Sequence, residues 1–128
     1  MKVTFLGTGT STGIPTIGVK RESCLSSDKR DNRLRSSILI EYKSKSILID
    51  CGPDFRQQML RIKKTKIDAI FFTHEHADHT AGLDDIRPIS FHNGKIPIYA
   101  HKRVVDHLKN RCDYLFDKKG DYPGSPQG

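Results

Sequence analysis

The sequence predicts an α/β fold, because short strand patterns rich in β-branched residues alternate with helix patterns. Three segments carry this prediction: a hairpin pattern over 37–50, helical spacing of apolar residues over 55–62, and an apolar run over 67–72. The 128 residues are 35% apolar, which is an ordinary composition for one compact unit. We therefore treat residues 1–128 as one domain.

The amino-terminal part is expected to hold a strand, a long loop and a hairpin. Residues 3–6 form a short apolar strand pattern, and the small residues of 7–13 then predict a loop. Residues 20–35 are polar and irregular. The runs 37–42 and 46–50 have the length and pattern of a hairpin, so these two strands should pair.

The following segment predicts a helix and then a central strand. Pro53 and Asp54 suit the first turn of a helix, whose apolar face is marked at 55, 59 and 62. Residues 67–72 are apolar except for Asp68, which is typical of a strand covered on both faces.

The carboxy-terminal part is expected to hold a helical turn, a strand and a helix. Leu83 and Ile86 suggest a short helical turn that Pro88 stops. Residues 96–100 form a strand pattern, and apolar residues at 104, 105, 108 and 112 mark one face of a helix. After Phe116 the pattern dissolves, and residues 120–128 read as a connecting segment.

Composition excludes several classes of protein. No apolar run approaches the roughly 20 residues that span a bilayer, and residues 1–7 are too short and polar for a signal peptide. The three cysteines are odd in number and not closely spaced, which argues against a disulfide framework and fits a reducing compartment. We expect a cytoplasmic protein without a membrane partner.

The formal net charge of +7 is spread along the chain rather than interleaved with aromatic residues. We interpret it as a solvated basic surface in preference to a nucleic-acid footprint. Such a surface would still favour a phosphate-bearing substrate.

The strongest chemical signal is His74-Glu75-His76-Ala77-Asp78-His79, which directly follows the predicted central strand. A chance His-x-His-x-Asp-His arises in roughly one in a thousand chains of this composition. Alternate residues of extended chain point the same way, so His74 and His76 can hold one ion while Asp78 and His79 face a second. Imidazole and carboxylate donors suit zinc first, with manganese and iron as alternatives.

Neighbouring residues leave open alternatives. Asp50 should end the hairpin at the same sheet edge, where it either orients a ligating histidine or closes the chain reversal at Gly52. Thr73 could support the ligands, although a threonine at a strand end is unremarkable. Glu75 should point away from the metals. His92, His101 and His107 are interpreted as a loop residue, a helix-start residue and an exposed helix residue, none of them a strong ligand candidate.

The glycine- and threonine-rich loop over 7–13 could cradle a phosphate through its backbone N–H groups. It lacks the ending of a P-loop, so we favour a tight turn of small residues beside the site.

These residues resemble the metallo-β-lactamase superfamily, whose signature is His-x-His-x-Asp-His after a strand. Phe5-Leu-Gly-Thr-Gly9 and Ile49-Asp50-Cys-Gly52 look like further landmarks in the expected order. The chain looks closest to the phosphodiesterase branch, especially the phosphoribosyl cyclic phosphodiesterase type and, more distantly, the transfer-RNA 3′-processing nucleases. The segments that favour the cyclic phosphodiesterase type are 13–15, 33–37, 50–57 and 82–88.

The resemblance implies a ligand set and a fold. It makes His74 and His76 ligands of one divalent metal, Asp78 and His79 ligands of a second, and Asp50 the residue that supports them. It implies the amino-terminal half of a four-layer αββα sandwich, apparently truncated before the second half that supplies the remaining ligands. The accessory zinc site of some relatives is not expected, because only Cys24 stands in that loop.

The function implied is hydrolysis of a phosphodiester, in a small cyclic phosphate, by a metal-bound hydroxide with Asp78 as the catalytic residue. One alternative is an RNA-processing endonuclease of the same superfamily. A second, from another class, is a catalytically incomplete metal-binding fragment that needs its missing half, a partner chain or self-association. We expect residues 1–128 alone to bind metal weakly and to turn over negligibly.

Overall fold

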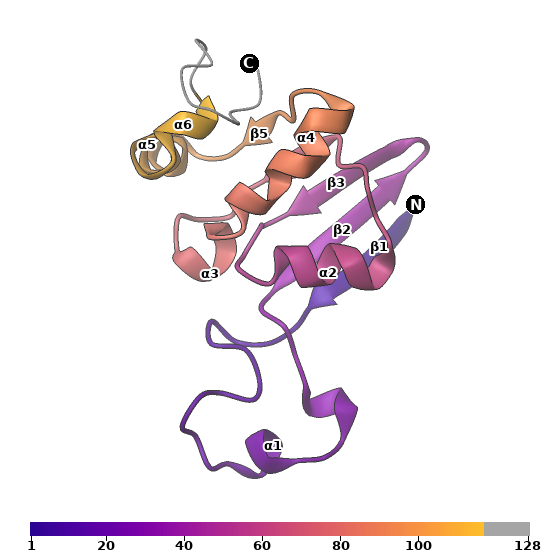
Figure 1. Cartoon of the computed structure of the whole chain (residues 1–128), viewed down its shortest axis with the longest axis vertical. Coiled ribbons are helices and arrows are strands. Elements are labelled where there is room, and N and C mark those ends of the chain that lie inside the picture. The colour runs from indigo at the N-terminus through magenta and orange to yellow at the C-terminus, as the bar shows by residue number, and fades with distance from the viewer. Residues whose placement is uncertain (117–128) are drawn as a thin grey trace.

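The structure is a computed structural model that describes residues 1–116 (Figure 1). Its sheet contains five strands in sequential order: β1 (Lys2–Gly7), β2 (Ser37–Tyr42), β3 (Lys45–Ile49), β4 (Ala69–Phe71) and β5 (Ile98–Tyr99). The pairs β1–β2 and β2–β3 are antiparallel, whereas β3–β4 and β4–β5 are parallel. This mixed sheet with its helices confirms the predicted α/β class.

The helices are mostly short and connect the strands. They are α1 (Glu22–Leu25), the 3₁₀ turn η1 (Lys29–Asp31), α2 (Phe55–Ile62), α3 (Ala77–Thr80), the 3₁₀ turn η2 (Leu83–Ile86), α4 (Arg87–Asn93), α5 (Lys102–Arg111) and α6 (Asp113–Phe116). Figure 1 shows α2 and α4 lying across the same face of the sheet. Within residues 1–116, no helix is long and apolar enough to cross a membrane.

The core lies between the sheet and these helices. Leu39, Leu48 and Ile70 are aligned across the three central strands and are at most 1% exposed. They belong to one apolar cluster with Phe55 of α2 and Leu108 of α5. Helices α2 and α5 are therefore fixed by the apolar faces that the sequence predicted.

The opposite face of the sheet is uncovered by the described residues, so the prediction of a central strand buried on both faces is wrong for them. Phe5, Phe71 and Tyr99 are 64%, 40% and 51% exposed, and Phe71 stacks on Tyr99 with 4.8 Å between ring centroids. Strand register places apolar residues in two rows across this face, one of 3, 40, 47 and 69 and one of 5, 38, 49, 71 and 99. We call these nine residues the outer sheet face.

The hairpin prediction is confirmed to within one residue, whereas other boundaries shift. Strands β4 and β5 are shorter than the patterns over 67–72 and 96–100. Pro88 lies in the first turn of α4 and does not stop a helix there, because a proline at that position sacrifices no intrahelical hydrogen bond. Residues 20–35, expected to be irregular, contain the single turns α1 and η1. The predicted connecting segment over 120–128 lies outside the described residues.

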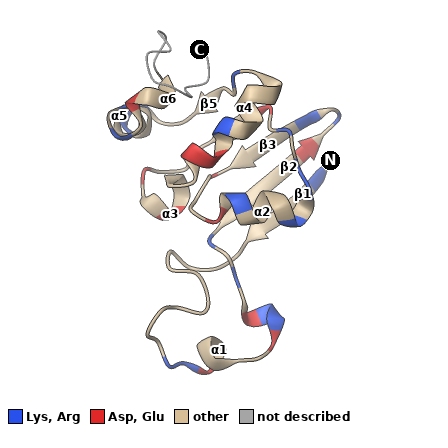
Figure 2. Cartoon of the chain, in the orientation of Figure 1, with Lys and Arg blue, Asp and Glu red and all other residues tan. Residues whose placement is uncertain are grey.

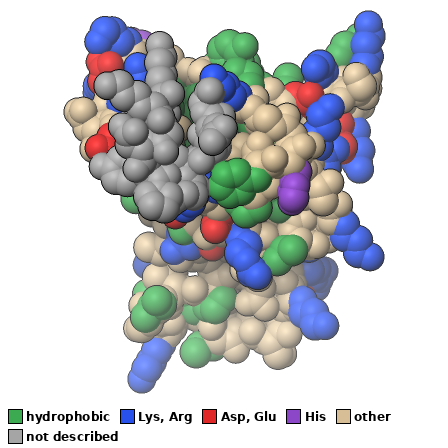
Figure 3. All heavy atoms as spheres, turned by 45° about the horizontal axis from the view of Figure 1, so that its top comes forward, with side chains coloured by type: hydrophobic (Ala, Val, Ile, Leu, Met, Phe, Trp, Pro, Cys, Tyr) green, Lys and Arg blue, Asp and Glu red, His purple; other side chains and the backbone are tan. Residues whose placement is uncertain are grey.

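Lysines gather at the sheet edge where β1 and β3 begin (Figure 2). Glu41 pairs with Lys64 and Lys2, and Asp68 pairs with Lys45 and Lys66. Figure 3 likewise shows basic side chains at one corner of the molecule with acidic side chains among them. This arrangement agrees with a solvated basic surface.

Candidate metal centre

The four predicted ligands lie together beyond the carboxyl end of β4. His74 and His76 are in the loop after this strand, and Asp78 and His79 are in the single turn α3. Strand β3 runs parallel to β4, with Ile49 beside Phe71, so Asp50 emerges at the same edge. Parallel pairing thus brings two segments far apart in sequence to one site.

Two glycines let the segment after β3 pack directly on the ligand loop. The amide of Cys51 donates to His79 O at 2.8 Å, and the amide of Gly82 donates to Cys51 O at 2.9 Å. A Cβ added at Gly52 would lie 2.1 Å from Asp78 O, and one added at Gly82 would lie 2.0 Å from Gly52 O. Only glycine permits this backbone approach, which fixes Asp78 and His79 relative to Asp50.

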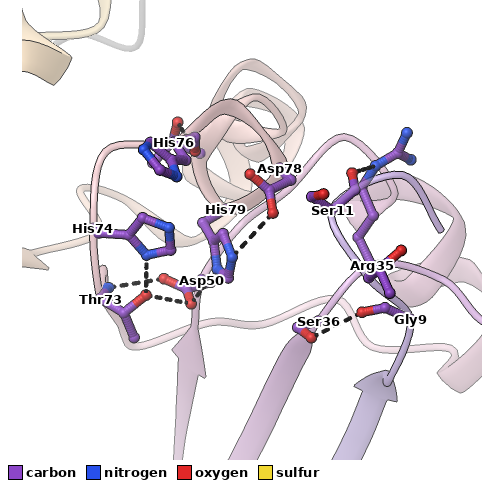
Figure 4. A network of polar contacts seen from close by, with 12 residues as sticks. Gly9, Ser11, Arg35, Ser36, Asp50, Thr73, His74, His76, Asp78 and His79 are labelled. Carbon is purple, nitrogen blue, oxygen red and sulfur yellow. Dashed lines mark hydrogen bonds and ion pairs between the residues drawn. The ribbon is translucent and has the colours of Figure 1, made fainter.

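Asp50 is 4% exposed and adopts a left-handed backbone conformation with φ of 59°. Its Oδ1 accepts a hydrogen bond from the Thr73 amide, and its Oδ2 accepts from Thr73 Oγ1 and interacts with His79 Nδ1, each at 2.8 Å (Figure 4). Aspartate tolerates positive φ better than most residues, and here this conformation aims the carboxylate at the ligand loop. Asp50 therefore holds the His79 ring, and its carboxylate contacts Thr73 and His79.

The imidazole rings are close to one another. The ring centroid of His74 lies 4.6 Å from that of His76 and 4.1 Å from that of His79. Asp78 Oδ2 lies 3.1 Å from His79 Nε2, the ring nitrogen that Asp50 leaves available. Two donors on one tetrahedral ion, with bonds of about 2.0–2.2 Å, are separated by about 3.3–3.6 Å. The Asp78–His79 pair has the spacing of an ion pair and comes within a few tenths of an ångström of this separation.

Within residues 1–116, no three His, Cys, Asp or Glu side chains converge closely enough to hold a metal ion together. The structure gathers the predicted ligands but does not close them on a single point. The division of two ligands for each of two ions stays a prediction. Each ion would then need further donors from outside this set.

Glu75 turns away from the ligands, as predicted. Its carboxylate forms an ion pair with Arg103 of α5, with 2.8 Å between Oε1 and Nη2. The pKa of Glu75 is lowered, first by a hydrogen bond from its own backbone amide and then by Arg103. This pair links the ligand loop to α5.

The remaining histidines lie elsewhere in the fold. His92 is in α4, so its prediction as a loop residue is wrong. His101 caps α5 by accepting from the Arg103 amide at 3.3 Å, and His107 is exposed on the same helix. Both of these positions are as predicted.

The sequence did not predict a brace between Arg35 and Asp54. Asp54 accepts hydrogen bonds from the Arg35 amide at 2.8 Å and from Arg35 Nη1 at 3.0 Å. Arg35 Nε donates to Ser11 O at 2.8 Å (Figure 4). The small-residue loop is thereby tied to the segment that carries Gly52. No spacing in the sequence relates 11, 35 and 54, since only the sheet register brings them together.

The small residues at the start of that loop serve close packing. A Cβ added at Gly7 would lie 2.0 Å from Arg35 O, and one added at Gly9 would lie 2.6 Å from Arg33 O. The glycines therefore permit the backbone of the loop to approach residues 33–35. This favours the tight-turn interpretation.

Comparisons with known proteins identify the family. The family model described as the β-lactamase superfamily domain matches residues 45–125, which include Asp50 and all four candidate ligands. Among curated proteins, the chain is 46% identical over 127 residues to an octanoyltransferase of Porphyromonas gingivalis, covering 98% of this chain and 25% of that protein. It is 35% identical over 101 residues to ribonuclease Z of Methanosarcina acetivorans, covering 77% of this chain and 28% of that protein.

Solved structures give the same result. A diphosphatase of the PhnP family has 49% identity and a TM-score of 0.85, with 89% of this chain and 46% of that chain covered. Zinc-bound PqqB from Methylobacterium extorquens, at 22% identity, a TM-score of 0.74 and coverage of 86% and 40%, shares the fold. The chain spans about a quarter of the curated relatives it matches and less than half of these two structures. Motif, fold and family match agree, and the chain belongs to the metallo-β-lactamase superfamily.

Proposed function

We propose that this chain supplies His74, His76, Asp78 and His79 to a divalent-metal centre that hydrolyses a phosphodiester bond. The observation that carries the proposal is the 3.1 Å distance between Asp78 Oδ2 and His79 Nε2. The other nitrogen of the same ring, Nδ1, contacts the Asp50 carboxylate. A carboxylate that holds the far nitrogen of an imidazole is the usual support of a metal-ligating histidine.

The donor chemistry fits divalent metals. Three imidazoles and one carboxylate suit zinc first, with manganese or iron as alternatives. When bound, a pair of such ions would lower the pKa of a shared water and neutralise charge on the phosphoryl oxygens. The remaining donors for two ions would come from a carboxy-terminal continuation or a partner chain.

The chain's own residues have distinct tasks in this proposal. Asp50 holds the His79 ring so that Nε2 faces Asp78. Asp78, whose side chain is 19% exposed, remains within reach of solvent and would accept a hydrogen bond from the attacking water. Gly52 keeps both residues in place through the backbone packing described above.

The relatives favour a small substrate. The matched diphosphatase is 49% identical to this chain, and the match covers 89% of this chain. The matched ribonuclease Z is 35% identical, and that match covers 77% of this chain. The lysine-rich edge lies at the opposite end of the sheet from the candidate ligands, so it does not line a path for RNA into the site. We therefore favour a small phosphate-bearing substrate over RNA, and we propose a cyclic phosphodiester because the sequence resemblance implies it.

RNA processing is the second enzymatic candidate, and the ribonuclease Z relatives support it. The octanoyltransferase name does not decide the question, because the match covers a quarter of that protein and its named activity can reside in the remainder. A metal-binding chain without activity of its own is the candidate from a different class. Its support is that, within residues 1–116, no three ligand-type side chains converge on one point.

The test compares the protein as produced from its gene with residues 1–128 alone. Both are stripped with a chelator, reloaded with zinc or manganese, and assayed on a ribose cyclic phosphate, a nucleoside diphosphate and a precursor transfer RNA. We expect metal-dependent hydrolysis of the cyclic diester, loss of activity in His76→Ala, and retention in the matched control His92→Ala. An unchanged rate after metal removal would refute the proposal, and preferential cleavage of the RNA would replace it with the nuclease.

A further inference from the structure

Thr73 lies two residues beyond the end of β4, between Asp50 and His74. We propose that Thr73 is a positioning residue whose hydroxyl relays the hydrogen bonding of Asp50 to His74, so that one carboxylate fixes the ring state of two ligands. This inference rests on the proposed function for the role of the two histidines. Its geometry does not depend on that function.

Thr73 contacts both neighbours with ordinary hydrogen-bond lengths. Its amide donates to Asp50 Oδ1 at 2.8 Å, and its Oγ1 lies 2.8 Å from Asp50 Oδ2 and 2.9 Å from His74 Nδ1 (Figure 4). The two bonds to one carboxylate hold the threonine backbone and side chain together. The hydroxyl is therefore locked between the acid and the ring.

Counting protons sets the direction of each bond. A carboxylate only accepts, whereas a hydroxyl has one proton to donate. If Thr73 Oγ1 gives its proton to Asp50, it can only accept from His74, so His74 Nδ1 must carry hydrogen. By the same logic His79 Nδ1 donates to Asp50 Oδ2 at 2.8 Å. The tautomers follow from this network, since hydrogen positions are assigned and not observed.

The consequence concerns the other nitrogen of each ring. With hydrogen on Nδ1, His74 and His79 each leave Nε2 as the ring nitrogen that can bind a metal ion. Their ring centroids lie 4.1 Å apart, and the two residues belong to different predicted ion sites. Asp50, directly and through Thr73, thus prepares one ligand of each site.

Thr80, the last residue of α3, offers a matched control. Its hydroxyl donates to backbone carbonyl oxygens, at 2.9 Å to His76 O and 3.3 Å to Glu75 O. Thr80→Val therefore removes a loop-stabilising hydroxyl without touching the relay. Thr73→Val removes the relay at nearly constant shape, and Thr73→Ser retains it.

The direct test reads the tautomer of His74 in the metal-free chain at pH 8 by long-range ¹H–¹⁵N correlation spectroscopy. We expect the Nδ1–H form in the parent, Thr73→Ser and Thr80→Val proteins, and loss of that form in Thr73→Val. An Nε2–H tautomer in the parent, or a Thr73→Val spectrum identical to that of Thr80→Val, would overturn the relay. Circular dichroism verifies that each variant is folded, and Thr73→Ser decides the question if Thr73→Val is not.

Zinc affinity, measured by competition with a chelating dye, provides the second readout. Thr73→Val should weaken binding by about 10–100-fold, as loss of an outer hydrogen-bonding partner does, and Thr73→Ser should restore it. Equal affinities of the parent and Thr73→Val would remove the functional part of the inference. If the tautomers are as expected but the protein as produced from its gene binds no zinc, the proposed function fails while the relay stands.

Discussion

Replacing Asp50 by asparagine keeps the shape of the side chain and its tolerance of positive φ, but removes acceptors from the centre of the ligand network. The amide oxygen can still accept from the Thr73 amide. Its NH₂ group then faces Thr73 Oγ1 and His79 Nδ1, which both lose a charged acceptor. At about 1.5 kcal/mol for each hydrogen bond to a charged group, the variant should lose about 3 kcal/mol of unfolding free energy.

The same substitution should weaken zinc binding. Without Asp50 the His79 ring is free to carry its proton on Nε2, the nitrogen that faces Asp78. We expect an affinity loss of about 10–100-fold. Urea unfolding followed by circular dichroism gives the stability, and chelator competition gives the affinity.

The matched control is Asp106→Asn. That side chain is 52% exposed on α5 and pairs with Lys102, so its loss should cost less than about 1 kcal/mol and leave zinc affinity unchanged. If Asp50→Asn behaved like Asp106→Asn in both assays, the network would be incidental to the site.

Three further predictions concern packing, association and pH. Gly52→Ala should lower the unfolding free energy by about 1–3 kcal/mol in urea titrations, because its Cβ would lie 2.1 Å from Asp78 O; an unchanged midpoint would mean that the two segments separate at no cost. Phe5→Lys should reduce self-association of residues 1–128 in sedimentation velocity, because it places a charge on the outer sheet face; equal association would exclude that face. Hydrogen bonds from the Ser46 amide and two lysines lower the pKa of Asp68 in the folded protein. Its stabilising contribution is therefore present above the unfolded pKa of about 4 and is lost as the pH falls through the lower folded pKa. Asp68→Asn should reduce the acid dependence of the unfolding free energy, and an identical pH profile would contradict this.

The sequence predicted well those parts of the fold that local patterns determine. The hairpin was predicted to within one residue because alternating β-branched residues and its loop length specify the pairing. The ligand cluster was predicted because four ligand-type residues stand within six positions of the chain. The helix after Pro53 followed from its apolar spacing.

Features that depend on register or on distant partners were beyond these patterns. The Arg35–Asp54 brace needs the sheet register to exist, and a proline at 88 reads equally well as a helix stop or a helix start. The apolar run over 67–72 is typical of a strand whose two faces are both buried. The run itself does not indicate that the described residues cover only one face of the sheet.

The most direct test of the metal centre is anomalous diffraction at the zinc edge from crystals of the zinc-loaded protein. We expect one peak within about 2.0–2.2 Å of imidazole nitrogens of His74 and His76, and a second at the same distances from Asp78 and His79. Zinc bound elsewhere, with these four side chains contacting no metal, would contradict it.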